Sequence, residues 1–127
     1  MLTEKDYCDY NTCVSLKEVG CRIETEWYIH QPSYERGSCY LCFGIPRETS
    51  VLDECDYIPR LSLYEAQKFL RETHNLHIEI TYSPSCWTGK IYDLKEWDYI
   101  KGFTFFESFE ETLHTLIKEA VKILKEK

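Results

Sequence analysis

Two serine–glutamate motifs bracket the second half of this 127-residue chain. Ser62 and Ser108 are each followed three residues later by a glutamate. In such a capping box the serine side chain accepts a hydrogen bond from an amide of the first helical turn, and the glutamate side chain accepts one from the serine amide. The motifs therefore predict two helices, over residues 63–74 and 109–124. Asn75 is a plausible stop for the first helix, because asparagine tolerates the left-handed conformation.

Three strand-like runs lie between the two helices. Residues 76–82 alternate between apolar and polar side chains, residues 87–94 contain Gly89 as the expected site of a bulge, and a third run centres on residues 103–106. Short connections favour an antiparallel meander, one face of which two amphipathic helices can cover. We therefore expect an α+β fold with an α-β-β-β-α core arranged as a two-layer sandwich.

The apolar periodicity also predicts which side chains this core buries. On the first strand the residues expected to face inward are Leu76, Ile78, Ile80 and Tyr82. The helical residues expected to be buried are Leu63, Ala66, Phe69, Leu70, Phe109, Leu113, Leu116, Ile117, Ala120, Val121 and Leu124.

The first 61 residues are expected to extend this core, so that residues 1–127 form a single domain. Asn11 and Gly20 mark a short helix, with asparagine as the N-cap and glycine in the left-handed position after the last turn. A helix of this length is unstable alone and has to pack against the rest of the protein.

A β-hairpin is predicted next. Residues 22–30 alternate in the manner of a half-buried strand, and residues 38–44 form the second strand candidate after a polar loop. Residues 46–61 contain two prolines and several acidic side chains, which is typical of a surface linker. One short strand near Val51 is expected within it.

The net charge of −7 limits the classes of partner. An acidic surface repels phosphate backbones, so nucleic acid is an unlikely partner. The helix–three strands–helix order is also that of double-stranded RNA binding domains, which need Lys or Arg where the second helix meets phosphates. Here that helix begins with Phe109, Glu110 and Glu111. RNA binding is therefore kept as a second alternative that the charge disfavours.

The cysteines and the apolar runs indicate a cytoplasmic protein. The chain has seven cysteines, an odd number, and begins with a polar segment in place of an apolar leader. No apolar run approaches the ~20 residues of a membrane span, so no membrane association is expected. The cysteines are expected to be reduced thiols, several of them in strands or in the core.

A zinc site is the main alternative to a purely protein-binding role. Cys39 and Cys42 form a C-x-x-C pair, which can supply two thiolates to a tetrahedral site. The candidates for the remaining two ligands are Cys55, Cys86, Cys21 and His30. A second C-x-x-C is absent from the sequence. If residues 39–42 are a strand, positions i and i+3 point to opposite faces and cannot share a metal. We therefore expect no bound metal or cofactor, and keep zinc or a small ligand as an alternative.

Several segments resemble a family of small uncharacterised proteins of bacteriophages, prophages and mobile elements of gut bacteria. The segments are SLKEVG at residues 15–20, PRLSLYEAQKFLRETH at 59–74, SFEETL at 108–113 and IKEA at 117–120. Phe69 and Thr112 replace the Trp and Ala expected in such relatives, which leaves the fold intact. The resemblance implies a fold and an origin, and implies no activity, cofactor or catalytic residue.

Surplus aromatic residues point to a binding function. The chain has 10 Tyr, 6 Phe and 3 Trp, more than its core can bury, and Tyr and Trp are enriched in protein interfaces. No catalytic motif is recognised. We therefore expect a non-enzymatic accessory protein that binds an unidentified protein partner, in an oligomeric state that the sequence leaves open. The expected interaction surface consists of Tyr92, Asp93, Glu96, Trp97, Asp98 and Tyr99.

Overall fold

The computed structural model describes residues 2–30, 40–43 and 57–126 of the chain. Two compact units are present, and each is described by itself. The first unit combines Met1–Cys8 with Ser62–Lys127, and the second unit is Asp9–Leu61. The predicted boundary between extension and core thus coincides with a unit boundary, although the first eight residues belong with the core. Whether the whole chain behaves as a single domain stays a prediction.

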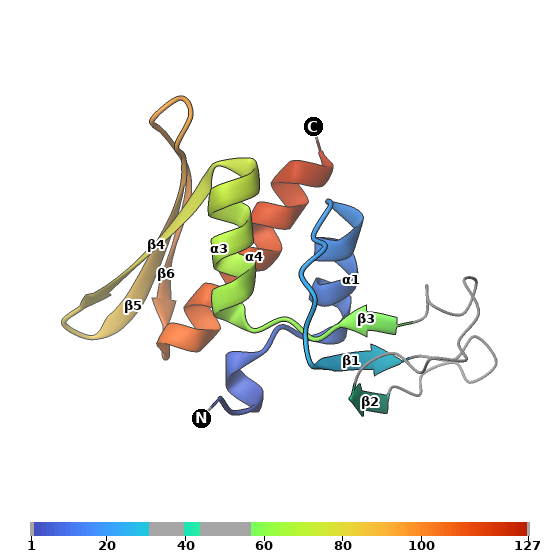
Figure 1. Ribbon diagram of the computed structural model, residues 1–127. Coiled ribbons are helices and arrows are strands. Elements are labelled where there is room, and N and C mark those ends of the chain that lie inside the picture. Colours follow the sequence, from blue (N-terminus) through green and yellow to red (C-terminus); the bar gives the residue numbers. More distant parts are fainter. Residues whose placement is uncertain (1, 31–39, 44–56, 127) are drawn as a thin grey trace. The chain divides into compact units, whose positions relative to one another are not determined.

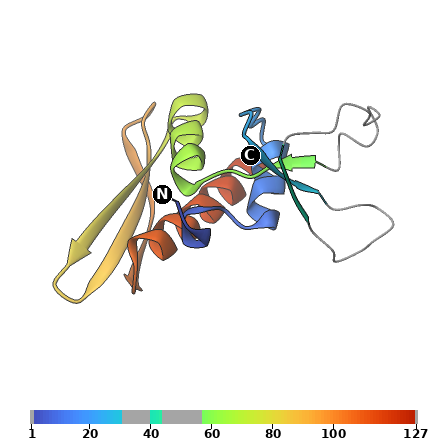
Figure 2. The same cartoon turned by 60° about the horizontal axis from the view of Figure 1, so that its bottom comes forward.

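The first unit is the predicted two-layer sandwich. Strands β4, β5 and β6 form an antiparallel sheet in this order, and helices α3 and α4 lie on the same face of it (Figures 1 and 2). The elements are α3 (Leu63–His74), β4 (Leu76–Ser83), β5 (Cys86–Asp93), β6 (Asp98–Phe106) and α4 (Phe109–Lys125). The α+β class and the α-β-β-β-α order are confirmed.

Helix α3 has the ends that its sequence predicts. Ser62 Oγ accepts a hydrogen bond from the Glu65 amide at 3.1 Å, and Glu65 Oε1 accepts one from the Ser62 amide at 3.0 Å. Asn75 ends the helix in the left-handed conformation, with φ of 58°. The buried face of α3 consists of Leu63, Ala66, Phe69 and Leu70, as predicted.

Replacement of Ser62 by alanine is expected to destabilise the protein by about 1 kcal/mol, because the Glu65 amide loses its acceptor at a buried helix start. The capping box predicted at Ser108 is only half formed: Ser108 accepts the Glu111 amide at 3.1 Å, but the reciprocal bond to the Glu111 side chain is not made. Ser108 is also half-buried, whereas Ser62 is buried. The Ser108→Ala variant is therefore the matched control, and its loss of stability should be smaller. Urea unfolding of both variants measures the difference; equal losses would show that the burial of Ser62 adds nothing to its contribution as a cap.

Helix α4 buries the face that its periodicity predicts, with two exceptions at its ends. Phe109 and Leu124 are only half-buried, because the first and last turns lie at the margin of the layer. Thr112, which was not assigned to the core, is fully buried. Its hydroxyl donates to the Ser108 carbonyl at 2.7 Å, so the polar atom is satisfied within the helix.

Strand β4 follows the predicted alternation only for its first half. Leu76 and Ile78 are buried, Ile80 is half-buried, and Tyr82 is 58% exposed. The prediction that Tyr82 contributes to the core was therefore wrong. Tyr82 lies next to the turn between β4 and β5, and its ring packs edge-on against Trp87 at 4.9 Å. Trp87 in turn contacts Phe109 at the start of α4, where the helical cover ends.

The N-terminal segment joins the first unit through its contacts with α3. Tyr7 pairs with Ser62, and the short 3₁₀ turn η1 (Glu4–Asp6) precedes it. The Tyr64 hydroxyl donates to Asp6 Oδ1 at 3.3 Å. The pKa of Tyr64 is raised, mainly by partial desolvation and to a smaller extent by the nearby charge of Asp6. Hydrogen bonding to the Thr3 amide lowers the pKa of Asp6.

The second unit contains helix α1 (Tyr10–Glu18) and strands β1 (Trp27–His30), β2 (Tyr40–Phe43) and β3 (Tyr57–Pro59). The strands form an antiparallel sheet in the order β2-β1-β3. The β1–β2 pairing confirms the predicted hairpin, although β1 is shorter than residues 22–30. Gly20 adopts φ of 99°, as its position after a helix predicts.

Two expectations for the second unit were wrong. Asp9, and not Asn11, caps α1, because its side chain accepts the Thr12 amide at 2.8 Å. The end of the expected linker is strand β3, which pairs with β1; Pro59 is tolerated because β3 is an edge strand. The short strand expected near Val51 lies outside the described residues.

Candidate functional site

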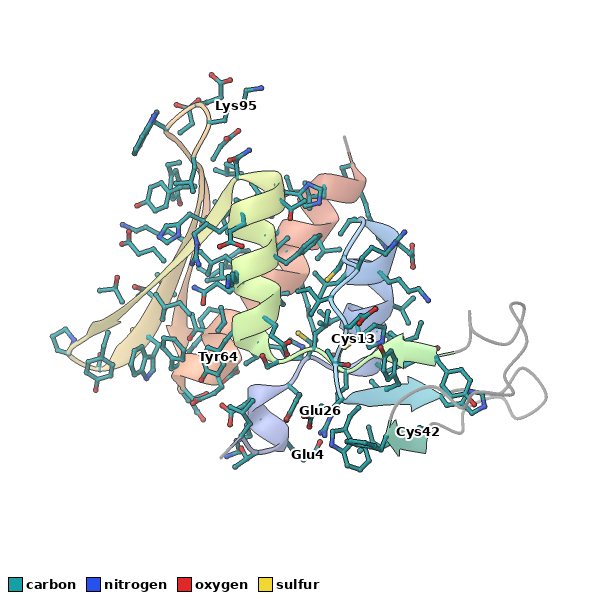
Figure 3. The ribbon with its side chains drawn as sticks, in the orientation of Figure 1. Glu4, Cys13, Glu26, Cys42, Tyr64 and Lys95 are labelled. Carbon is teal, nitrogen blue, oxygen red and sulfur yellow. The ribbon has the colours of Figure 1, made fainter. Side chains whose placement is uncertain are left out.

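The connection between β5 and β6 brings all six predicted interaction residues to one end of the sheet. Register pairs Asp93 with Asp98 and Tyr92 with Tyr99, and residues 94–97 form the turn. We call this group the hairpin tip; its members are Tyr92, Asp93, Glu96, Trp97, Asp98 and Tyr99. Lys95 marks its outer end in Figure 3, where the turn extends beyond the C-terminal end of α3.

The turn is held by a carboxylate and by an unusual backbone conformation. Asp93 Oδ1 accepts the amides of Lys95 at 2.9 Å and Glu96 at 3.4 Å. The chain then reaches Trp97, which adopts the left-handed region with φ of 59°. A bulky side chain is rare in this region, where its Cβ approaches the carbonyl oxygen of the backbone. Asp93 is therefore a positioning residue, and Trp97 is the strained one.

The aromatic side chains of the tip are largely open to solvent. Trp97 is 85% exposed and Tyr99 is 58% exposed. The rings of Tyr92 and Tyr99 pack edge to face, with centroids 6.0 Å apart. A register shift between Ile91 and Tyr92 changes the alternation of β6, so that Tyr99 and Gly102 share a face although they are three residues apart.

Gly102 determines how Tyr99 lies. A Cβ at Gly102 would meet the Tyr99 hydroxyl at 2.6 Å, so the tyrosine ring extends over the bare backbone of the glycine. Tyr99 therefore lies along the outer face of the sheet and does not stand away from it. Its pairing with Tyr92 places two phenol rings side by side on this face, next to the turn that contains Trp97.

The left-handed backbone of Trp97 gives a test of its role in folding. Trp97→Gly is expected to raise the free energy of unfolding by about 1 kcal/mol relative to Trp97→Ala, because only glycine adopts this conformation without the Cβ clash. Both variants lose the indole, so the difference between their free energies of unfolding reports the cost of the left-handed backbone conformation. Urea unfolding measures it. Equal stabilities of the two variants would show that φ at this position carries no strain.

The charges around the tip and at the start of α4 are mainly negative. Residues 93–98 hold three carboxylates against the single Lys95. At the other end of the sheet α4 begins beside Glu107, Glu110 and Glu111, of which the first and last are exposed. The helix start that meets phosphates in double-stranded RNA binding domains thus has the opposite charge here.

The candidate zinc ligands are distributed over both units. Cys42 lies on β2 of the second unit and Cys86 begins β5 of the first unit; both are half-buried. Cys39 and Cys55 lie outside the described residues. Among residues 2–30, 40–43 and 57–126, no group of three or more His, Cys, Asp or Glu side chains is arranged to hold a metal ion. The zinc hypothesis stays a prediction, which native mass spectrometry of protein purified without chelator would test.

A second pair of exposed aromatic residues was not singled out from the sequence. Trp27 on β1 lies opposite Phe43 on β2, with ring centroids 5.5 Å apart, and Phe43 is 72% exposed. Both residues fall within predicted strands, where aromatic side chains are common and therefore do not indicate a binding site. Exposure, which only the structure gives, is the property that distinguishes them.

Comparisons with protein-family models, with curated proteins and with solved structures give no match. In the part of the chain that the structure describes, none of the helices combines the length and the apolar character that crossing a bilayer requires. Function is therefore inferred from the side chains of the chain itself.

Proposed function

We propose that this chain is a non-enzymatic accessory protein of the phage or mobile-element type, which acts by binding another protein through its hairpin tip. The observation that carries the proposal is Trp97, whose side chain is 85% exposed on a backbone with φ of 59°. The fold gains little burial from this indole, and the left-handed backbone conformation disfavours a bulky side chain. A contact of the indole with a partner protein would explain why a tryptophan occupies this position although it does not favour folding.

The surroundings of Trp97 support the same reading. Tryptophan and tyrosine are the side chains that most often dominate the binding energy of protein interfaces. Tyr99 and Tyr92 add a pair of packed phenol rings on the adjoining strands, and Tyr99 is itself exposed. The carboxylates of the tip favour a partner with a basic surface, which they also attract before contact.

Capture of a partner from host lysate tests this proposal when three tagged proteins are compared: the natural chain, Trp97→Ala and Phe43→Ala. Phe43 is the matched control, because it is another largely exposed aromatic residue, at 72%, in the other unit. We expect one stoichiometric partner with the natural chain and with Phe43→Ala, and its loss with Trp97→Ala. Recovery with all three proteins, or with none, would contradict the proposal.

RNA binding is the second candidate, because the α-β-β-β-α order with both helices on one face of the sheet favours it. The acidic start of α4 opposes it. A gel shift with double-stranded RNA at low salt discriminates the two, because phosphate contacts are strongest there. Retardation that disappears after Lys or Arg replacement would favour RNA; unretarded RNA would remove this candidate.

A further inference from the structure

We propose that the Gln67 side chain blocks the free edge of strand β4 and so keeps this strand from pairing with a second copy of the chain. Strand β4 lies at one edge of the sheet β4-β5-β6, and no strand among the described residues pairs with its outer side. Such an edge presents a row of backbone N–H and C=O groups that can pair with another chain. This edge is separate from the hairpin tip, which joins β5 to β6.

The register of β4 and β5 shows which backbone groups face this edge. Asn75 and Leu94 lie opposite each other just beyond the two strands, and the Leu94 amide donates to the Asn75 carbonyl at 2.8 Å. Hydrogen-bonded and non-hydrogen-bonded pairs alternate along an antiparallel ladder. The residue after Asn75, and every second residue after that, therefore turns its N–H and C=O groups away from β5. The residues whose backbone groups face the free edge are Leu76, Ile78, Ile80 and Tyr82.

The Gln67 side chain occupies the middle of this edge. Gln67 is a half-buried residue of α3, and its Nε2 donates to the Ile78 carbonyl oxygen at 3.0 Å. The side-chain amide therefore stands where the N–H of an added strand would have to lie. Because Ile78 lies near the middle of β4, an antiparallel pairing that uses most of this strand needs its carbonyl. An added strand has to displace Gln67 first.

The charges of β4 leave one register of self-pairing open. Two copies of β4 that pair antiparallel about Glu79 would place the two Glu79 carboxylates directly opposite each other, which is unfavourable. A pairing centred on Ile80 is also two-fold symmetric, and it places Glu79 opposite Thr81 of the other copy, so that no like charges meet. In this register the Ile78 carbonyl faces Tyr82 of the other copy. The bond from Gln67 is therefore the feature that opposes it.

The opposite edge of the same sheet is protected by other means. Two register shifts interrupt the pairing of β6 with β5. Lys101 lies opposite the fully buried Ile91, on the side of the sheet that the helices cover, and its ammonium bonds to Glu119 of α4 at 2.5 Å. Bulges and inward-pointing charges are devices that keep edge strands from pairing. Strand β4 pairs regularly with β5 and has apolar residues on that side, so its protection has to come from another element.

Substitution of Gln67 tests the proposal, with methionine, which has a similar length and no N–H donor, and with lysine, which keeps a donor. The three residues have similar helix propensities, so α3 should form equally well in each protein. Sedimentation velocity and hydrogen exchange are measured over a range of protein concentrations. We expect the mass of Gln67→Met to rise with concentration towards twice that of the natural chain, and the exchange of its Ile80 amide to slow by about tenfold or more. Gln67→Lys should behave as the natural chain does.

Addition of Tyr82→Pro to the Gln67→Met variant identifies the surface through which the copies associate. Proline removes an N–H that faces the free edge, and edge strands tolerate it at such a position, where Tyr82 is also exposed. We expect this second change to restore the mass of the natural chain. The proposal would be overturned by a Gln67→Met variant that matches the natural chain at every concentration, by association that Tyr82→Pro does not reverse, or by equal association of Gln67→Lys. Loss of the natural circular dichroism spectrum in Gln67→Met would also overturn it, because the bond would then support the fold itself.

Discussion

Replacement of Gly89 by alanine is expected to destabilise the protein by about 1–3 kcal/mol, although alanine is a small residue. A Cβ built at Gly89 would lie 1.9 Å from Leu116 Cδ1 and 3.0 Å from Thr112 Cγ2 on α4. Leu116 and Thr112 are fully buried and have no solvent to move into. The helix therefore has to shift away from β5, and the packing on both sides of the contact is lost.

Gly102 provides the matched control on the neighbouring strand. A Cβ there would also make a close contact, 2.6 Å from the Tyr99 hydroxyl, but Tyr99 is an exposed side chain that can swing into solvent. The Gly102→Ala variant should therefore stay within about 0.5 kcal/mol of the natural protein. Urea unfolding followed by circular dichroism compares the two variants. Equal effects would contradict the account of why α4 can approach the sheet so closely at Gly89.

Replacement of Leu116 by alanine is expected to cost about 2–5 kcal/mol, because a fully buried leucine is truncated and a cavity remains between α4 and the sheet. The same substitution removes the atom that an alanine at position 89 would meet. The double variant should therefore be more stable than the sum of the single losses predicts, by about 0.5–3 kcal/mol. A double-mutant cycle of urea unfolding measures this coupling. Additive losses would show that position 89 does not sense Leu116.

Several elements could be predicted because their signals are local. The Ser62–Glu65 box and Asn75 determine the ends of α3 through hydrogen bonds and a backbone conformation that lie within a few residues of each other. The inward residues of α3 and most of those of α4 follow from the helical period alone. The bulge expected at Gly89 was misplaced: the β5–β6 register shifts between Trp87 and Gly89 because β6 has the extra residue there, whereas Gly89 pairs regularly with Ile80.

Other features could not be predicted because they depend on distant contacts. Strand β3 exists through its pairing with β1, whose residues lie about thirty positions earlier, and its own three residues include a proline. The exposure of Tyr82 depends on where α4 stops covering the sheet. No sequence pattern predicts that Trp97 adopts the left-handed conformation, since glycine and asparagine are the usual residues there.

The candidate site could be predicted only in part. The six residues of the hairpin tip are near neighbours in the sequence, so a single turn suffices to bring them together. Two unfavourable features of the turn could not be predicted from the sequence. Asp93 and Asp98 lie directly opposite each other, and Trp97 is exposed to solvent in a strained backbone conformation. The proposal that the hairpin tip is a binding surface rests on these properties.

Hydroxyl-radical footprinting of the captured complex tests most directly whether the hairpin tip is the contact surface. Oxidation of Trp97 and Tyr99 is compared between the isolated protein and the complex, with Trp27 and Phe43 of the second unit as internal references. We expect strong protection of Trp97 and Tyr99 in the complex and unchanged oxidation of the two reference residues. A complex in which Trp97 is oxidised as readily as in the isolated protein would contradict the proposed function.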